Sequence, residues 1–246
     1  MSKKKNGNNI IEFSEGTIAE KKSQRIKATE LKQFEPLTEN QSKFFNAYKN
    51  GDYFIMLCGS AGTGKSFIAL YKAIEEVMDK DSFFKKIVIV RSIVPGRDIG
   101  FLPGSLEEKQ ALYELPYEEI CYTLFNRKDA YEALKECGRI RFLTTTSLRG
   151  LSLDDSIIVV DEFQNCNWGE LNTIMGRIGN RSKIIFCGDY KQNDLTKSNK
   201  DVSAFHDFVK VAKNMRSFTE IYFTPEDIVR SNLTKEWIMS CEQMGY

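Results

Sequence analysis

The chain has 246 residues, of which 41% are hydrophobic, and this supports one sizeable core with a small appendage at most. Its 35 basic and 34 acidic side chains nearly cancel, so bulk charge favours no particular partner. No apolar run approaches the roughly 20 residues that span a bilayer, and we expect no membrane partner. Six cysteines without a C-x-x-C pair argue against structural zinc and favour a reducing, cytoplasmic location.

Residues 1–35 form a polar N-terminal extension that we expect to be partly disordered, before a folded domain over 36–246. Thr38 then precedes a helical pattern and is the predicted N-cap. Gln41 lies three residues later, which is the spacing of a capping box. An amide at that position could instead pair with two edges of adenine. The local pattern leaves both interpretations open.

Residues 59–66 match the phosphate-binding pattern G-x-x-x-x-G-K-[ST] at every fixed position. They follow a predicted buried strand at 53–58 and open a predicted helix at 65–79, which is the context that the motif requires. Lys65 is predicted to reach the β- and γ-phosphates of a nucleotide, and the Ser66 hydroxyl to bind Mg²⁺. The rest of the loop is predicted to hold phosphate oxygens through backbone amides: Gly59, Ser60, Ala61, Gly62, Thr63 and Gly64.

The rest of the chain alternates short apolar runs with helical patterns, which indicates an α/β fold. Its sheet is expected to be mostly parallel, with helices on both faces. Residues 92–138 are predicted to be a helical insertion that projects from the sheet and could carry a partner or substrate surface. Further predicted strands cover 86–91, 139–145, 156–160, 182–187 and 217–223. Predicted helical segments lie near 105–113, 117–126, 129–136, 168–178 and 201–213, with a last helix from Glu226.

The apolar run before Asp161 and Glu162 ends in these two carboxylates. In nucleotide hydrolases an acid at such a strand end holds Mg²⁺, and we assign that role to Asp161. An adjacent glutamate can orient and deprotonate the attacking water, and Glu162 is that candidate. The alternative is a helix N-cap with an exposed acid.

Two further elements of the site are expected downstream. Gln192 follows another predicted strand and could contact the γ-phosphate. Phosphoryl transfer also commonly needs an arginine that neutralises developing charge. An ordinary surface or ion-pair role is the alternative for each candidate. The candidates are Arg149, Arg177, Arg181 and Arg230.

Taken together, six blocks resemble the PhoH-like family from about Thr38 to the C-terminus. Their sequences are Gly-Ser-Ala-Gly-Thr-Gly-Lys-Ser (59–66), Asp-Ile-Gly-Phe-Leu-Pro-Gly-Ser-Leu-Glu-Glu-Lys (98–109), Asp-Glu-Phe-Gln-Asn (161–165), Arg-Ile-Gly with Ser-Lys (177–183), Gly-Asp-Tyr-Lys-Gln-Asn-Asp-Leu (188–195) and Asp-Ile-Val-Arg (227–230). The chain departs from the family pattern at Phe163, where alanine is usual, at Leu151, where the second arginine of an Arg-Gly-Arg-Thr stretch is expected, and at Ser92, where proline is common.

The resemblance implies a three-layer P-loop NTPase fold, similar to the RecA-like core of superfamily 1 helicases. It further implies ATP and Mg²⁺ as ligands, ATP hydrolysis, a hexameric ring, and an arginine supplied by a neighbouring copy. Arg177 and Arg230 match the family's arginines, and the adenine role of Gln41 gains support. We therefore expect an ATPase coupled to binding or remodelling of single-stranded RNA or DNA, as in a helicase. The alternative is a nucleotide-gated switch that binds a protein partner.

Overall fold

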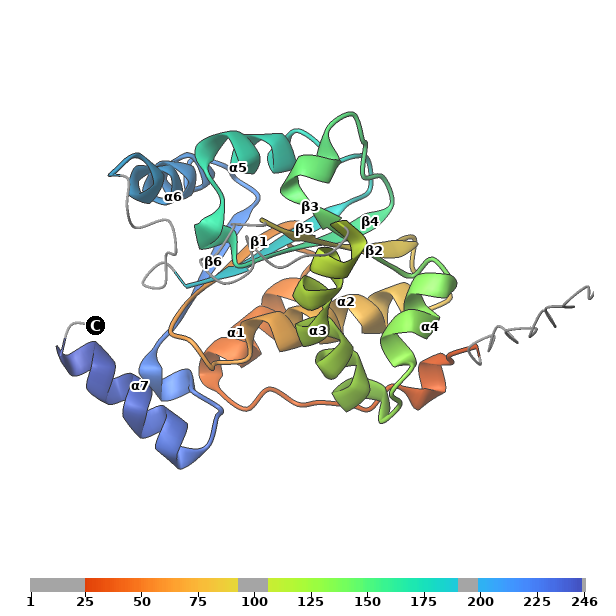
Figure 1. Cartoon of the computed structure of the whole chain (residues 1–246), viewed down its shortest axis with the longest axis horizontal. Helices are drawn as coiled ribbons and strands as arrows, with labels where there is room; N and C mark the ends of the chain where they lie inside the picture. Colours follow the sequence, from red (N-terminus) through yellow and green to blue (C-terminus); the bar gives the residue numbers. More distant parts are fainter. Residues whose placement is uncertain (1–24, 93–105, 190–198, 245–246) are drawn as a thin grey trace, which may run out of the picture.

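The computed structural model describes residues 25–92, 106–189 and 199–244, and the described strands form one six-stranded sheet (Figure 1). All pairings are parallel, in the order β3-β2-β4-β5-β1-β6. The strands are β1 (Phe54–Gly59), β2 (Lys86–Arg91), β3 (Ile140–Thr144), β4 (Ser156–Asp161), β5 (Lys183–Gly188) and β6 (Phe218–Phe223). The expected α/β architecture is confirmed, and the described sheet is parallel throughout.

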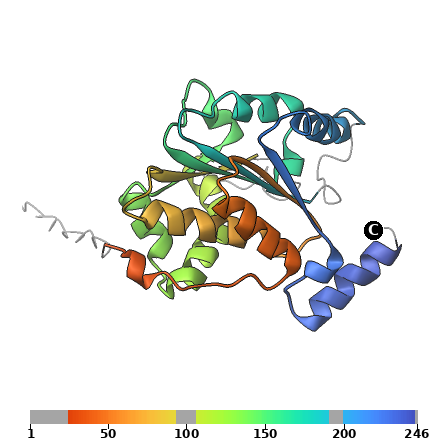
Figure 2. The same ribbon diagram turned by 180° about the vertical axis from the view of Figure 1, so that it is seen from behind.

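Helices cover both faces of the sheet, as Figures 1 and 2 show from opposite sides. Successive strand residues point to opposite faces. Ile55 therefore belongs to the core under one helical layer, and its neighbour Met56 to the core under the other. The first layer contains α1 (Glu39–Lys49), α2 (Lys65–Met78), α3 (Leu106–Phe125) and α4 (Ala130–Glu136). The second contains α5 (Trp168–Met175) and α6 (Asn199–Ala212).

Within the predicted insertion at 92–138, the described residues from 106 on form α3 and α4, in the crossover between β2 and its parallel neighbour β3. These helices do not project, because Tyr117, Cys121 and Leu124 of α3 are buried in the core beneath the sheet. The predicted break near 116 is also wrong, since α3 continues through Pro116. A mid-helix proline removes one backbone hydrogen bond. Burial of the apolar face outweighs that local preference.

The C-terminal segment differs from its prediction as well. Pro225–Asp227 forms a 3₁₀ turn, η4, and the last helix, α7, spans only Asn232–Met244. The Asp227 carboxylate accepts hydrogen bonds from the Thr224 amide at 2.9 Å and from Asn40 at 2.7 Å, which ties the turn to α1. In Figure 1, α7 stands away from the sheet. Among the described residues, no helix combines the length and apolar character needed to traverse a bilayer.

Candidate nucleotide site

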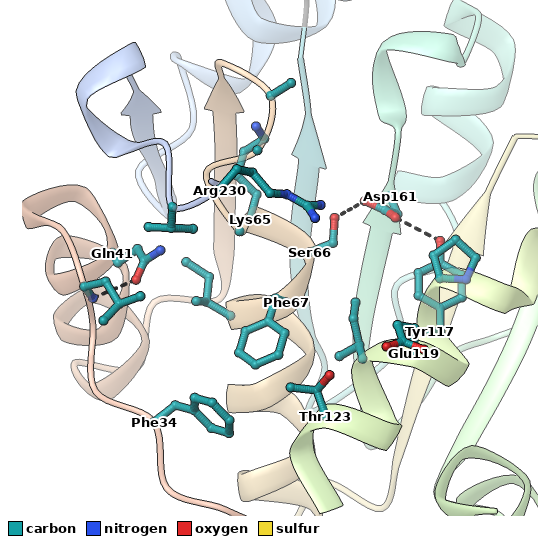
Figure 3. A pocket seen from close by; sticks show the side chains of 18 of the residues that line it. Phe34, Gln41, Lys65, Ser66, Phe67, Tyr117, Glu119, Thr123, Asp161 and Arg230 are labelled. Atoms are coloured by element: carbon teal, nitrogen blue, oxygen red, sulfur yellow. Dashed lines mark hydrogen bonds between the residues drawn. The ribbon is translucent and has the colours of Figure 1, made fainter. Parts of the chain in front are cut away.

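A cavity of about 890 Å³ lies at the carboxyl edge of the sheet, where the loop between β1 and α2 faces the tip of β4 (Figure 3). The two strands are not adjacent, since β5 lies between them. Ligands of open α/β sheets bind at this edge, where the strand ends and helix N-termini meet. The cavity therefore lies where the sequence places a phosphate site.

Gly59 ends β1, and no other residue fits there. A Cβ atom at this position would lie 2.0 Å from the backbone oxygen of Phe223 in β6, and the residue has a φ of +124°. The Ser60 amide donates to the same Phe223 oxygen at 3.0 Å. The loop is therefore anchored to β6 before it turns toward α2.

The Lys65 ammonium lies within the loop. It donates to the backbone oxygens of Gly59 at 2.9 Å and Ser60 at 2.7 Å, and to the Thr63 hydroxyl at 3.3 Å. Burial lowers the pKa of Lys65, and the nearby Asp189 carboxylate opposes this effect. A buried cation surrounded by neutral oxygens is well suited to an anionic ligand.

Ser66, Asp161 and Tyr117 form a continuous hydrogen-bonded group (Figure 3). The Ser66 hydroxyl donates to Asp161 Oδ1 at 2.6 Å, and the Tyr117 hydroxyl donates to Asp161 Oδ2 at 2.9 Å. Burial raises the pKa of Tyr117, and the Asp161 carboxylate raises it further, so the phenol stays a proton donor. The group joins α2, β4 and α3 at one point.

These oxygens fit Mg²⁺, which is held in such sites by one or two protein oxygens together with phosphate oxygens and water. Within the described ranges, no cluster of three or more His, Cys, Asp or Glu side chains could hold a metal alone. Ser66 and Asp161 are the side chains that would hold Mg²⁺ if it entered the cavity with a nucleotide.

Glu162 begins the turn after β4 with a φ of +51°, and both it and Asp161 line the cavity. Strict strand geometry would have sent the two acids to opposite faces. Burial raises the pKa of Glu162, and the adjacent Asp161 carboxylate raises it further. A carboxylate with a raised pKa is a better proton acceptor near neutrality.

The departure at Phe163 is accommodated by the core. Its ring is buried and packs against Phe186 at 5.4 Å and Phe205 at 5.1 Å between centroids. A small residue at this position would leave part of the space under α6 unfilled. The change therefore concerns packing behind the site and leaves its carboxylates in place.

Gln41 is buried at the rim of the cavity and links α1 to the phosphate loop. Its Oε1 accepts from the Leu37 amide at 2.8 Å, and its Nε2 donates to the Thr63 backbone oxygen at 3.0 Å. Thr38 is the N-cap, accepting from the Gln41 amide at 3.3 Å. The Gln41 side chain thus accepts from the amide of Leu37, whereas a capping box would use the amide of Thr38. A side-chain amide has four hydrogen-bonding positions, and the described residues occupy two of those of Gln41.

The candidate arginines lie at different edges of the sheet. Arg230 lines the cavity, and its guanidinium extends toward Ser66 in Figure 3. Arg177 and Arg181 precede β5 at the opposite, amino edge, where the Arg177 backbone oxygen accepts from the Leu153 amide. Arg149 is exposed after η2 (Thr145–Leu148). Gln192 lies outside the described residues.

Sequence reasoning missed several side chains that line the cavity, and two of them, Tyr117 and Arg91, lie beside Asp161. Arg91 ends β2 beside Asp161 in the register of the sheet. The rule that flagged Asp161, a polar residue at the end of a buried strand, would have found it. Tyr117 follows Pro116 in a segment without a motif, so no local signal was available.

The family model described as PhoH-like protein matches residues 33–242. The chain belongs to the PhoH-like family. A PhoH-like protein of Bacillus subtilis is 31% identical over 96% of this chain and 72% of its own length. Protein PhoH2 of the same organism is 40% identical over 57% of this chain, which corresponds to 32% of its own length. A PhoH-like protein of Mycobacterium bovis is 30% identical, over 83% of this chain and 57% of its own length.

The solved structures that match part of this chain include two helicases. The Hef helicase domain of Pyrococcus furiosus matches with a TM-score of 0.44 and 13% identity, over 75% of this chain and 38% of that one. The Pif1 helicase of Candida albicans matches with a TM-score of 0.36 and 15% identity, over 78% and 40% respectively. This PhoH-like chain has an α/β fold with a parallel six-stranded sheet and carries the phosphate-loop sequence between β1 and α2.

Proposed function

We propose that this chain binds ATP with Mg²⁺ and hydrolyses it. The observation that carries the proposal is the 2.6 Å hydrogen bond between Ser66 and Asp161, which joins the phosphate loop to the tip of β4. Loop amides and Lys65 hold the β- and γ-phosphates. Mg²⁺, when bound through Ser66 and Asp161, neutralises charge on the phosphates. Glu162 orients the attacking water and accepts its proton.

Arg230 is the arginine that acts on the chain's own nucleotide. It lines the cavity, and its guanidinium extends toward Ser66. A cation at that place stabilises the charge that builds on the transferred phosphoryl group. Replacing Arg230 with alanine lowers turnover more than it weakens ATP binding, because the interaction strengthens in the transition state.

Two variants test the hydrolysis. Lys65→Ala removes the cation that holds the phosphates, so both ATP binding and turnover are lost. Glu162→Gln keeps the shape of the site and ATP binding, but lowers turnover by about 100-fold or more. Lys49→Ala, an exposed lysine of α1, serves as the control. Normal turnover in both site variants would refute the assignment.

We further propose that hydrolysis is coupled to single-stranded RNA or DNA. Helicases of superfamily 1 place ATP between two RecA-like cores of one chain, and the described residues form one such core. A motor built on this one core needs a second core beside it, and a neighbouring copy in a hexameric ring would supply one. Addition of single-stranded RNA or DNA is expected to raise the ATPase rate, and the increase should shrink as salt rises.

The position of Arg177 supports the ring. It lies at the amino edge of the sheet, away from its own cavity, so it reaches a phosphate only on a neighbouring copy. Mixing inactive Arg177→Ala chains with inactive Lys65→Ala chains then restores activity, because intact cavities meet intact arginines. Random mixing in equal amounts predicts about a quarter of the wild-type rate for a closed ring. Absence of any recovery would exclude Arg177 as the arginine acting in trans.

A nucleotide-gated switch for a protein partner is the second candidate. One observation favours it, namely that Ile238 of α7 lies 3.6 Å from the place where a Cβ on Gly62 would be. The same helix exposes Leu233 and Trp237. Loop movement on ATP binding would then alter the exposure of an apolar helix. ATP-dependent protection of α7 from proteolysis, without stimulation by any single strand, would favour this function.

A further inference from the structure

Gln164 connects the tips of two strands through its side-chain amide. The residue is buried in η3 (Phe163–Asn165), directly after β4. Its Nε2 donates to the Glu162 carboxylate, and its Oε1 accepts from the backbone amide of Asp189 at 3.1 Å. Asp189 follows β5, the strand between β4 and β1. One amide therefore touches both the candidate base and the next strand end.

The two partners fix the orientation of that amide. A carboxylate only accepts and a backbone N–H only donates, so the amide nitrogen must face Glu162 and its oxygen must face Asp189. Glutamate in place of Gln164 retains the acceptor but brings a second negative charge to Glu162. Methionine fills a similar volume and provides neither group. Glutamine alone satisfies both contacts at this length of side chain.

Gly188 shows how closely the amide is held. A Cβ on Gly188 would lie 2.5 Å from Gln164 Oε1 and 2.6 Å from the Phe163 ring. Contacts that short do not occur with real Cβ atoms, so any side chain at 188 would push the Gln164 amide away from the Asp189 amide. The tip of β5 thus accommodates the Gln164 amide against the Asp189 backbone amide only because residue 188 is glycine.

We propose that Gln164 is the positioning residue that holds the Glu162 carboxylate toward the attacking water. The inference rests on the proposed function of Glu162 as the general base. A base must lie within hydrogen-bonding reach of the proton that it accepts, about 2.6–3.2 Å. Glu162 leads the chain out of the strand at a φ of +51°. The Gln164 hydrogen bond holds the Glu162 carboxylate in one orientation and ties that orientation to the tip of β5.

The first test compares Gln164→Glu and Gln164→Met with wild type in steady-state ATP hydrolysis. Both lower kcat by about 10- to 100-fold, which is part of the roughly 10²- to 10⁴-fold that a general base supplies. The affinity for ATP stays within about threefold, because the phosphate loop is untouched. Gln164→Glu is isosteric, and it carries the test if the methionine variant does not fold.

Gln110→Met is the matched control. Gln110 also donates a hydrogen bond to a glutamate, at 3.0 Å to Glu114 of the same helix, and neither residue lines the cavity. Its loss leaves kcat unchanged. An unchanged kcat in folded Gln164→Glu, or an equal loss in the control, would overturn the proposal.

A double-mutant cycle then separates positioning from general structural support. Single-turnover rates are measured for Glu162→Gln with and without Gln164→Met. If Gln164 acts through Glu162, its replacement has no further effect once the base is gone. If it only supports the fold, the same loss of about tenfold or more appears in both backgrounds, and the inference is wrong. A wild type without ATPase activity would instead end the proposed function, and this inference with it.

Discussion

Tyr117→Phe is the substitution that most directly tests the Ser66–Asp161–Tyr117 group. It removes the hydroxyl that donates to Asp161 Oδ2 at 2.9 Å and keeps the ring that packs against Phe142 at 5.9 Å. Hydrogen bonds to charged groups contribute about 1.5–3 kcal/mol. Because Asp161 borders a cavity that water can enter, the lower value applies. The melting temperature should fall by about 3–6 °C for a domain of this size.

Tyr117→Phe should affect the Mg²⁺ requirement of ATP hydrolysis more strongly than it affects stability. Residues that orient a metal ligand typically affect metal affinity by about 10- to 100-fold when replaced. The Mg²⁺ concentration that half-saturates ATP hydrolysis is therefore expected to rise by about tenfold or more in Tyr117→Phe. The rate at saturating Mg²⁺ should change less, since the Asp161 carboxylate itself is retained.

Tyr131→Phe provides the matched control. The Tyr131 hydroxyl donates to the Glu114 carboxylate at 2.7 Å, is equally buried, and lies away from the cavity. This variant should lose a similar amount of stability with an unchanged Mg²⁺ requirement. An equal shift of the Mg²⁺ requirement in both variants, or none in either, would refute the role given to Tyr117.

Two predictions concern the fold. Gly59→Ala should lower the free energy of unfolding by several kcal/mol more than Gly138→Ala, as measured by chemical denaturation. Both residues have positive φ. A Cβ on Gly59 would lie 2.0 Å from the Phe223 oxygen, whereas a Cβ on Gly138 would meet nothing within 4 Å. Equal losses of stability in the two variants would show that β6 can move away from a Cβ at position 59. Burial raises the pKa of the Cys58 and Cys121 thiols to about 12, and Cys166 and Cys187 are also buried. Alkylation at pH 8 should therefore modify Cys137 and Cys241 quickly and the other four only after unfolding, as counted by intact mass; rapid labelling of a third thiol would contradict the described core.

The local parts of the fold are predictable because they depend on few neighbours. The run Ile157–Val160 consists of β-branched residues, which favour a strand, and it forms buried β4. The glycine loop carries its own signal in residues that are consecutive in the chain. These two segments place Lys65, Ser66, Asp161 and Glu162 before any three-dimensional information is available.

Contacts between distant segments were not predictable in this way. Tyr117 lies 44 residues from Asp161 in the chain, and nothing in its neighbourhood indicates that α3 folds back over β4. The surrounding prolines and glycines instead favoured a broken, projecting segment. The free energy that keeps α3 continuous comes from burying Tyr117, Cys121 and Leu124, and that burial exists only in the folded sheet. For the leucine alone, full burial is worth roughly 1.5–3 kcal/mol.

By contrast, the sequence alone predicts the edge of the sheet at which each candidate arginine lies, once the strands are taken as parallel. Arg177 and Arg181 precede the predicted strand at 182–187, whereas Arg230 follows the one at 217–223. In a parallel sheet, residues before a strand lie at its amino edge and residues after it at the carboxyl edge, where the ligand binds. The rule that located Asp161 thus places Arg230 at the same edge of the sheet as the phosphate loop. An arginine at the amino edge can serve catalysis only if one copy presents that edge to the carboxyl edge of the next, and such a head-to-tail contact either closes into a ring or continues as a filament.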